Sequence, residues 1–270
     1  MIDLNTGSNS QVSPLTLCDK INAVIDASLI ERRQKEPVRN YLGASQIGEE
    51  CLRKLCYSYA HTPVDPGREI SARMVRIFDT GHAAEDTVAL QLGKDESQED
   101  AFFKNLTAKW MWDAGFRLIR KNGDGGQIGF TAVEGRFQGH TDGIITGNPF
   151  PDEIPRPCGW ENKALGQKGW NKIKKHGVKA ASPVYFGQMQ IYMGYLELRA
   201  YLFTALNKNT QELHHELIPY EPHAAQALSD KAVQVILSVE AGELLPRCTD
   251  SEDYFYCKWC DWRKRCWSYV

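Results

Sequence analysis

The cysteines near the two ends of this chain place the strongest constraint on how it can fold. Cys257, Cys260 and Cys266 form a C-x2-C-x5-C run, and Cys51 is a candidate for a distant fourth ligand. The C-x2-C spacing lets two thiolates reach one inorganic centre, and the third cysteine follows after a short loop. Zinc and a [4Fe–4S] cube can both be held by four thiolates. Either would join segments that lie far apart in the sequence, so we expect one domain rather than two separable halves.

The other cysteines have different expected roles. Cys56 is the alternative to Cys51 as the first ligand, whereas Cys18, Cys158 and Cys248 are interpreted as small hydrophobic side chains. Eight cysteines in 270 residues are too few for a disulfide scaffold, and no secretory signal pattern opens the sequence. The clustered cysteines are therefore expected to be metal ligands.

The composition is that of an ordinary globular protein, with 42% hydrophobic residues, 24% charged residues and a net charge of −2. Because the chain is almost neutral, any contact with nucleic acid has to come from a local basic patch. No apolar stretch approaches the roughly 18–20 residues that a membrane span requires. We expect a cytoplasmic protein that has no membrane partner.

The hydrophobic spacing predicts helices first, then a sheet, then alternating helices and strands. Helices are expected over residues 15–36, from a Ser45 cap through Tyr57, over 70–92, from Ser182 to about Leu198, and over about 223–240. Strands are expected over residues 116–120, 127–131, 135–145, 159–165, 200–206 and 212–220. This order predicts an α/β fold with a mixed central sheet.

Asp142 and the triplet Glu161-Asn162-Lys163 are the clearest candidates for a chemical site. Residues i and i+2 of a strand point to the same face, so Glu161 and Lys163 are expected to project together. Carboxylates can hold Mg2+ or Mn2+, and such ions activate water and stabilise the charge that develops during phosphodiester hydrolysis. An E-x-K triplet also arises by chance as surface charges of a hairpin, and the residues alone leave that interpretation open.

These residues resemble the motifs of the PD-(D/E)XK nuclease superfamily, in its RecB-like branch. The resemblance implies a restriction-endonuclease-like core, a mixed central sheet flanked by helices. It implies that Asp142, Glu161 and Lys163 are catalytic and that the carboxylates bind Mg2+ or Mn2+. The main-chain carbonyl of Asn162 is a further candidate metal ligand under the same resemblance.

Two further segments belong to this resemblance. Gly81-x-x-x-Glu85 matches the helix that precedes the sheet in lambda-type phage exonucleases, which implies that Glu85 is a catalytic metal ligand. His82 lies one turn away on the same helix face and is a second candidate ligand, or a histidine with a purely structural role. Gln188 and Tyr192 match positions that face the active site and contact DNA in the family, and core packing of an aromatic-rich helix is the alternative.

The cysteine run is similar to that of AddB-type and CRISPR-associated iron–sulfur nucleases, in which one cysteine precedes the nuclease core and C-x2-C-x5-C follows it. Cys51-Leu52-Arg53 resembles the C-x-R segment of their first ligand. The resemblance implies a [4Fe–4S] cluster on Cys51, Cys257, Cys260 and Cys266, with zinc as the alternative. It covers residues 41–270 as a single nuclease domain and leaves residues 1–40 as an N-terminal helical extension.

A basic stretch follows the E-x-K triplet directly. No acidic residue occurs from Asn162 to Leu196, and the candidate DNA contacts within this stretch are Lys168, Lys172, Lys174 and Lys175. Charge runs are usually solvated faces, but this one adjoins the predicted metal site, where a phosphate backbone must pass. Trp170 is expected to stack on a base or to anchor the segment.

The resulting prediction is a metal-dependent DNA exonuclease for DNA with a free end, acting in recombination, repair or phage DNA processing. If phage-encoded, it would act in the host cytoplasm. The alternative is a catalytically inactive nucleic-acid-binding module with a structural iron–sulfur or zinc site. The sequence contains no helicase motif, so a helicase, annealing or recombination partner is expected on a separate chain, and an oligomer is compatible with this prediction. Cleavage polarity and strand preference are not encoded in these motifs.

Overall fold

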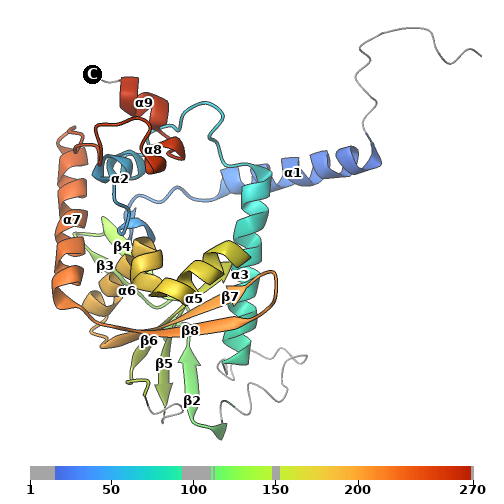
Figure 1. Cartoon of the computed structure of the whole chain (residues 1–270), viewed down its shortest axis with the longest axis vertical. Helices are drawn as coiled ribbons and strands as arrows, with labels where there is room; N and C mark the ends of the chain where they lie inside the picture. Colours follow the sequence, from blue (N-terminus) through green and yellow to red (C-terminus); the bar gives the residue numbers. More distant parts are fainter. Residues whose placement is uncertain (1–15, 93–110, 112, 148–152, 269–270) are drawn as a thin grey trace, which may run out of the picture. The chain divides into compact units, whose positions relative to one another are not determined.

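The computed structural model describes residues 16–92, 111, 113–147 and 153–268 (Figure 1). The chain divides into two compact units, one made of residues 1–37 and 70–78, the other of residues 38–69 and 79–270. In the smaller unit, helix α1 (Leu17–Lys35) begins with a capping box between Thr16 and Asp19, and Arg76 forms an ion pair with Asp26. The expected helix over residues 15–36 is therefore present.

The larger unit contains a five-stranded mixed sheet with the strand order β2-β5-β6-β7-β8. Its strands are β2 (Phe116–Ile119), β5 (Gly143–Gly147), β6 (Cys158–Leu165), β7 (Ala200–Asn207) and β8 (Leu213–Pro219). Only the β6–β7 pair is parallel, and it places Glu161 opposite Phe203. The expected α/β fold with a mixed sheet is thus confirmed, and β6 lies at the centre of the sheet.

A second sheet of three strands has the order β1-β4-β3. It consists of β1 (Leu42–Gly43), β3 (Gly129–Ala132) and β4 (Phe137–His140). The sequence analysis was wrong in treating residues 135–145 as one strand, because the chain leaves this sheet after His140 and enters the larger sheet at Gly143. Asp142 therefore lies in the crossing between two sheets rather than at the end of one strand.

Helices cover both faces of the larger sheet. Helices α5 (Gln167–Ala181) and α6 (Pro183–Tyr195) contact one face, and α7 (Pro222–Glu240) packs against α6 and α2 (Leu52–Tyr59). The C-terminal half of α3 (Ala72–Gln91) contributes Val88 and Ala89 to the core on the other side, with Trp160 of β6. Figure 1 shows α5 and α6 lying across the sheet and α7 running along its side.

Two local expectations need correction. Ser45 does not cap a long helix, because residues Ala44–Gln46 form a 3-10 turn and α2 begins after Cys51, which occupies the N-cap position. Helix α5 was not predicted, because Gly169 and Gly177 weaken its local helical signal. It forms because Trp170 and Ile173 are buried against the sheet. No helix in the described part of the chain is long and apolar enough to span a membrane.

The C-terminal segment, with α8 (Phe255–Lys258) and α9 (Arg263–Ser268), is joined to α2 and the loop after it by protein contacts. The Trp262 indole N–H donates to the Thr62 carbonyl at 2.9 Å, and the Asp65 carboxylate accepts from the backbone N–H groups of Lys264 and Arg265. Trp262 also packs on Tyr57. Protein contacts therefore bring together segments that lie far apart in the sequence.

Candidate active site

Strand β6 positions the E-x-K pair as the period of a strand predicts. Glu161 and Lys163 project from the same face and form an ion pair between Oε1 and Nζ. The crossing from β4 to β5 brings Asp142 beside them, where its Oδ2 accepts a hydrogen bond from the Asn162 backbone N–H at 2.8 Å. The surface-hairpin interpretation of the triplet is wrong, because β6 is a central strand and Glu161 has an exposed fraction of 0%.

One oxygen of the Glu161 carboxylate accepts hydrogen bonds, whereas the other has no hydrogen-bond partner among the described residues. Its Oε1 receives hydrogen bonds from Lys163 Nζ and from Gln188 Nε2, the latter at 2.9 Å. Its Oε2 is buried and has no hydrogen-bond partner among the described residues. A buried carboxylate oxygen without a donor is costly, so this oxygen is suited to a cation.

Glu85 reaches the site from α3 and is held by a residue that the sequence analysis did not consider. The guanidinium of Arg120 pairs with Glu85 through Nη2 and with Asp86 through Nη1 at 2.5 Å. Arg120 Nε also donates to the backbone carbonyl of Asp142 at 3.2 Å. Arg120 therefore links the helix carboxylates to the Asp142 turn, a role visible only once β2 and α3 are placed side by side.

Burial and the charge of Asp142 raise the proton affinity of Glu161 and Glu85. Burial, together with the charge of Asp142, raises the pKa of Glu161 to about 8 and that of Glu85 to about 7. Burial likewise raises the pKa of Asp142. Although burial disfavours a charged amine, Glu161 and Asp142 raise the pKa of Lys163. The site therefore combines a permanently charged lysine with acids that share protons near neutral pH.

The donor set fits a hard divalent ion, although no three His, Cys, Asp or Glu side chains in the described segments converge on a single ion position. The oxygens are those that Mg2+ and Mn2+ prefer. Arg120 and Lys163 form ion pairs with Glu85 and Glu161, respectively. An incoming ion would compete with these two side chains for the carboxylates.

The remaining polar neighbours are buried and orient the carboxylates. Gln188 is 5% exposed and Tyr192 is 2% exposed, and Gln188 Nε2 contacts both Glu161 and the Tyr192 hydroxyl. Thr141 Oγ1 accepts from Tyr201 at 2.5 Å and donates to the Gly143 carbonyl, which holds the turn that carries Asp142. Sequence reasoning missed Thr141 and Tyr201, which have no motif of their own.

His82 and Asn162, the two other candidate metal ligands, differ in their exposure. His82 is exposed on α3, and its charge lowers the pKa of Asp142, so it faces the rim of the site. Asn162 is buried, and its side-chain amide has no hydrogen-bond partner within the described part of the chain. Its backbone N–H is engaged by Asp142.

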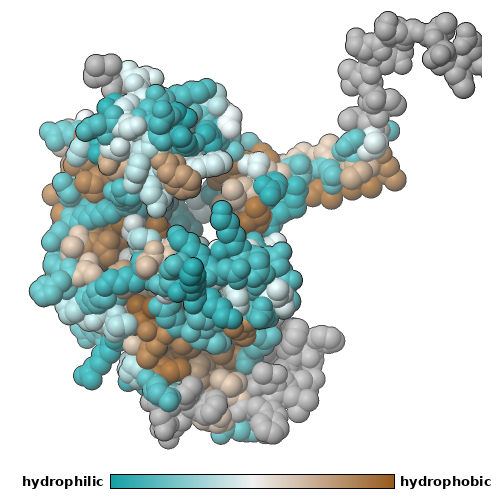
Figure 2. Space-filling model, viewed as in Figure 1, coloured by the Kyte–Doolittle hydropathy of each residue, from teal (hydrophilic) through white to brown (hydrophobic). Residues whose placement is uncertain are grey.

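The basic stretch forms helix α5, which begins directly after β6. Its candidate DNA contacts are all exposed: Lys168, Lys172, Lys174 and Lys175. Figure 2 shows a mainly hydrophilic surface over this helix. Lys172 Nζ donates to the Ala181 carbonyl, and Lys174 lies 4.7 Å from the centroid of the Trp170 ring. Trp170 is itself buried and donates to the Ala205 carbonyl, so it anchors the helix and is not available for base stacking.

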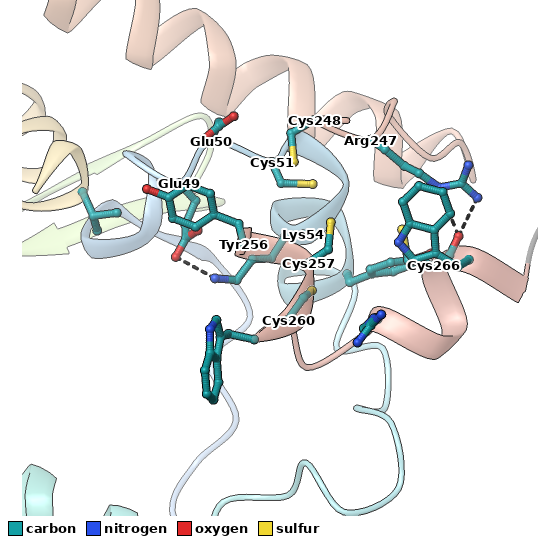
Figure 3. Close-up of a pocket in the computed structure, with 15 residues that line it drawn as sticks. Glu49, Glu50, Cys51, Lys54, Arg247, Cys248, Tyr256, Cys257, Cys260 and Cys266 are labelled. Atoms are coloured by element: carbon teal, nitrogen blue, oxygen red, sulfur yellow. Dashed lines mark hydrogen bonds and ion pairs between the residues drawn. The ribbon is translucent and has the colours of Figure 1, made fainter. Parts of the chain in front are cut away.

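The cysteines gather at a separate cavity of about 170 Å³ between α2 and the C-terminal segment (Figure 3). The cysteines that line it are Cys51, Cys248, Cys257, Cys260 and Cys266. Figure 3 shows Cys51, Cys248, Cys257 and Cys260 pointing toward one another. Burial raises the pKa of the Cys257 and Cys260 thiols, so a metal centre that needs thiolates would release protons on binding.

This cavity distinguishes between the alternatives left open by the sequence. Cys51 lines it, whereas Cys56 lies within α2 and is buried in the hydrophobic core. Cys158 is buried in β6 and Cys18 is exposed on α1, in keeping with ordinary side chains. Cys248, which the sequence analysis interpreted as a small hydrophobic residue, also lines the cavity. The only sequence signal for it is its short distance from Cys257.

Comparison with known proteins gives a likeness of fold only. No family model and no curated protein matches the sequence. The structure is similar to an alkaline exonuclease (LHK-Exo) from Laribacter hongkongensis, at 11% identity over 80% of this chain and 93% of that chain, with a TM-score of 0.47. It is also similar to LHK-Exo in complex with dAMP, at 12% identity over 76% and 90% of the two chains, with a TM-score of 0.47. For SSO0001 the identity is 13% over 91% and 96%, with a TM-score of 0.48.

Proposed function

We propose that this chain is a metal-dependent deoxyribonuclease that hydrolyses phosphodiester bonds of DNA with a free end. The observation that carries the proposal is the Glu161 carboxylate. It is enclosed at the centre of the sheet with one oxygen unpartnered, beside Lys163 and under the influence of the charges of Asp142 and Glu85. A fold that only bound DNA would have no reason to bear the cost of burying these acids together.

The three carboxylates of Glu85, Asp142 and Glu161 would hold Mg2+ or Mn2+, with the main-chain carbonyl of Asn162 as a further oxygen ligand. A bound divalent ion polarises a phosphoryl oxygen and lowers the pKa of its bound water. Lys163 keeps its proton and can donate hydrogen bonds to the attacking water or to the phosphate. Gln188 holds the Glu161 carboxylate in one orientation through its amide N–H.

The reaction forms a bond between the water oxygen and phosphorus, and one ester P–O bond breaks. The water loses a proton, and the leaving oxygen gains one. Because the pKa of Lys163 is raised, its ammonium acts by electrostatic stabilisation rather than as a base. The exposed lysines of α5 extend from the end of β6 and would contact the phosphate backbone as it approaches the site.

The decisive test is degradation of end-labelled linear DNA and closed circular DNA, single- and double-stranded, with Mg2+, Mn2+ or EDTA. We expect the linear substrates to be degraded only with a divalent ion. Glu161→Gln and Asp142→Asn should abolish this activity. Glu216→Gln is the matched control. Glu216 lies on β8 of the same sheet, and its carboxylate accepts a hydrogen bond from the Val178 backbone N–H, outside the site.

Each other result has a definite meaning. DNA binding without cleavage in any metal would overturn the proposal and favour the inactive binding module. Equal loss of activity in Glu216→Gln would mean that removing any charge from the sheet disturbs folding. Cleavage of circular DNA at the same rate as linear DNA would keep the nuclease and reject the requirement for a free end.

We propose, as a separate part of the function, that the cysteine cavity holds a [4Fe–4S] cluster. A zinc ion bound by four thiolates at about 2.3 Å leaves no open space between the sulfurs. The cavity has about 170 Å³ and is lined by five cysteines together with aromatic side chains such as Trp259 and Trp267. A multi-atom cluster fits this arrangement better than one ion. When bound, it would add an inorganic link between α2 and the C-terminal segment.

Protein purified anaerobically should therefore contain about four iron and four sulfide per chain and should be brown. Cys257→Ala, Cys260→Ala and Cys266→Ala should each remove the colour. Cys56→Ala should retain it, because Cys56 lies outside the cavity. Colourless wild-type protein with one tightly bound zinc would reject the iron–sulfur proposal and leave the nuclease proposal standing.

A further inference from the structure

Helix α1 carries an exposed apolar stripe. Its members are spaced at i, i+4, i+7 and i+8, which at about 3.6 residues per turn places them on one face of the helix. They are Leu17, Ile21, Val24 and Ile25, and their exposed fractions run from 44% to 75%. Figure 2 shows hydrophobic side chains along this helix. Helices gain most of their stability by packing an apolar face, so we expect another surface to cover this stripe.

The stripe points away from the contact between α1 and α3. That contact includes the ion pair between Asp26 of α1 and Arg76 of α3. Asp26, Leu29 and Ile30 are half-buried, and at about 100° per residue they lie on the side of α1 opposite the stripe. No residue of α1 is buried, so the contact with α3 covers only part of the helix. The opposite face is available to a partner.

Residues 70–78, in the same unit, repeat this pattern. Their exposed apolar side chains are again spaced at i, i+4, i+7 and i+8: Ile70, Met74, Ile77 and Phe78. Ala72 and Val75, which lie between them in the sequence, are buried. The small unit therefore exposes large apolar side chains from both of its segments. Such a concentration is typical of a surface that binds another macromolecule.

The charged residues beside the α1 stripe identify the partner. Lys20 and Glu31 are eleven positions apart, which is about three turns, so they lie along the same edge of the stripe. In an antiparallel pair of α1 helices with a two-fold axis near Ile25, Lys20 of each copy faces Glu31 of the other. A parallel pair would instead place like charges opposite each other, which is unfavourable. The edge of the stripe is therefore complementary to itself in one orientation.

The charge of α1 argues against a lipid surface as the partner. Helices that lie on membranes are rich in Lys and Arg on their polar face. Helix α1 instead carries three acidic and four basic side chains, and Lys35 pairs with Glu31 within the helix. Its mixed charges suit a partner that also has mixed charges, such as another copy of α1.

We propose that α1 and residues 70–78 form a two-fold interface between two copies of this chain, in which the two α1 helices pack antiparallel through their apolar stripes. A two-fold interface uses the same patch on both copies. One side of a stable interface takes about 20–30 residues, and residues 16–37 with 70–78 supply a surface of this size. The interface uses no residue of the candidate active site or of the cysteine cavity, so it is independent of both proposals above.

The test is the mass of the full chain in solution, measured by light scattering and by sedimentation velocity over a range of concentrations. We expect the wild type to form a dimer of twice the 30.6 kDa chain mass. Ile21→Asp and Val24→Asp should each raise the dissociation constant about tenfold or more, because the added charge would lose its water in an apolar interface. Leu237→Asp is the matched control and should keep the dimer, since Leu237 is an exposed apolar residue of α7, outside the small unit.

A charge exchange tests the orientation of the two helices. Lys20→Glu and Glu31→Lys should each weaken the dimer, because either change places like charges opposite each other across the interface. The two changes in one chain should restore association toward that of the wild type. Circular dichroism and the thermal unfolding midpoint check that every variant is folded.

Each contrary result is decisive. Wild-type protein that is monomeric at every concentration would overturn the proposal, and so would a dimer that survives both Ile21→Asp and Val24→Asp. Equal weakening by Leu237→Asp would overturn the assignment of the interface to α1. Failure of the double charge exchange to restore association would overturn the antiparallel arrangement.

Discussion

Binding of Mg2+ to the candidate active site should release protons, and more of them at pH 7 than at pH 8.5. The pKa of Glu161 is about 8 and that of Glu85 about 7, both raised by burial and by Asp142. At pH 7 Glu161 then carries about 0.9 proton and Glu85 about 0.5, and at pH 8.5 they carry about 0.3 together. A divalent ion requires the ionised carboxylates, so its binding should displace about 1.4 protons at pH 7 and about 0.3 at pH 8.5.

Protonation of Glu161 and Glu85 also weakens the binding of Mg2+. Because both groups must lose their protons before the ion binds, the apparent Kd for Mg2+ should be about 15-fold larger at pH 7 than at pH 8.5. The assay is calorimetric titration of Mg2+ into protein stripped of divalent ions, in two buffers with different ionisation enthalpies. The difference in heat between the buffers gives the number of protons released.

Two variants test the predicted number of protons released on Mg2+ binding. Glu161→Gln removes the group that holds most of the proton, so release at pH 7 should fall to about 0.5 or below. Glu216→Gln should release as many protons as wild type. Release of fewer than about 0.3 protons at pH 7, or no fall between pH 7 and pH 8.5, would refute the account of the site as carboxylates that share protons through burial and mutual repulsion.

Three further outcomes follow from individual contacts. Arg120→Met should move the acid limb of the pH–rate profile for nuclease activity to higher pH, because Arg120 lowers the pKa of the α3 carboxylate Glu85. Gly159→Ala should lower the thermal unfolding midpoint by the equivalent of about 1–3 kcal/mol, because a Cβ there would lie 2.0 Å from the Tyr201 ring. Replacing Lys168 and Lys175 with Ala should weaken DNA binding at every sequence and reduce the slope of log K against log salt by about 2, measured by fluorescence anisotropy.

Matched variants separate these effects from general loss of stability. Arg120→Lys should restore most of the profile, because it keeps a cation beside Glu85. Gly123→Ala adds a Cβ with nothing within 4 Å in a turn and should leave the unfolding midpoint nearly unchanged. Lys179→Ala removes a lysine that already pairs with Glu221 and should leave the salt slope as it is. Equal effects in a variant and its control would contradict the corresponding contact.

Several elements could be predicted from the sequence because their signals are local. The alternation around Glu161 and Lys163 predicted strand β6, and the apolar spacing predicted helices α1 and α7. The cysteine spacing placed three thiols at one loop, since a C-x2-C turn brings its side chains together in almost any fold. Such patterns act over a few residues, so they survive without knowledge of the rest of the chain.

Tertiary structure alone decided the properties that make these residues a site. The chain crosses between two sheets at Asp142, and no local pattern marks that crossing. The partnership of Arg120 with Glu85, and the entry of Cys248 into the cysteine cavity, join side chains from segments whose spacing in the sequence carries no signal. The raised proton affinity of Glu161 likewise comes from burial by several elements at once. Sequence patterns identify which residues are chemically able to form a site, whereas desolvation and charge coupling depend on distances that only the folded chain sets.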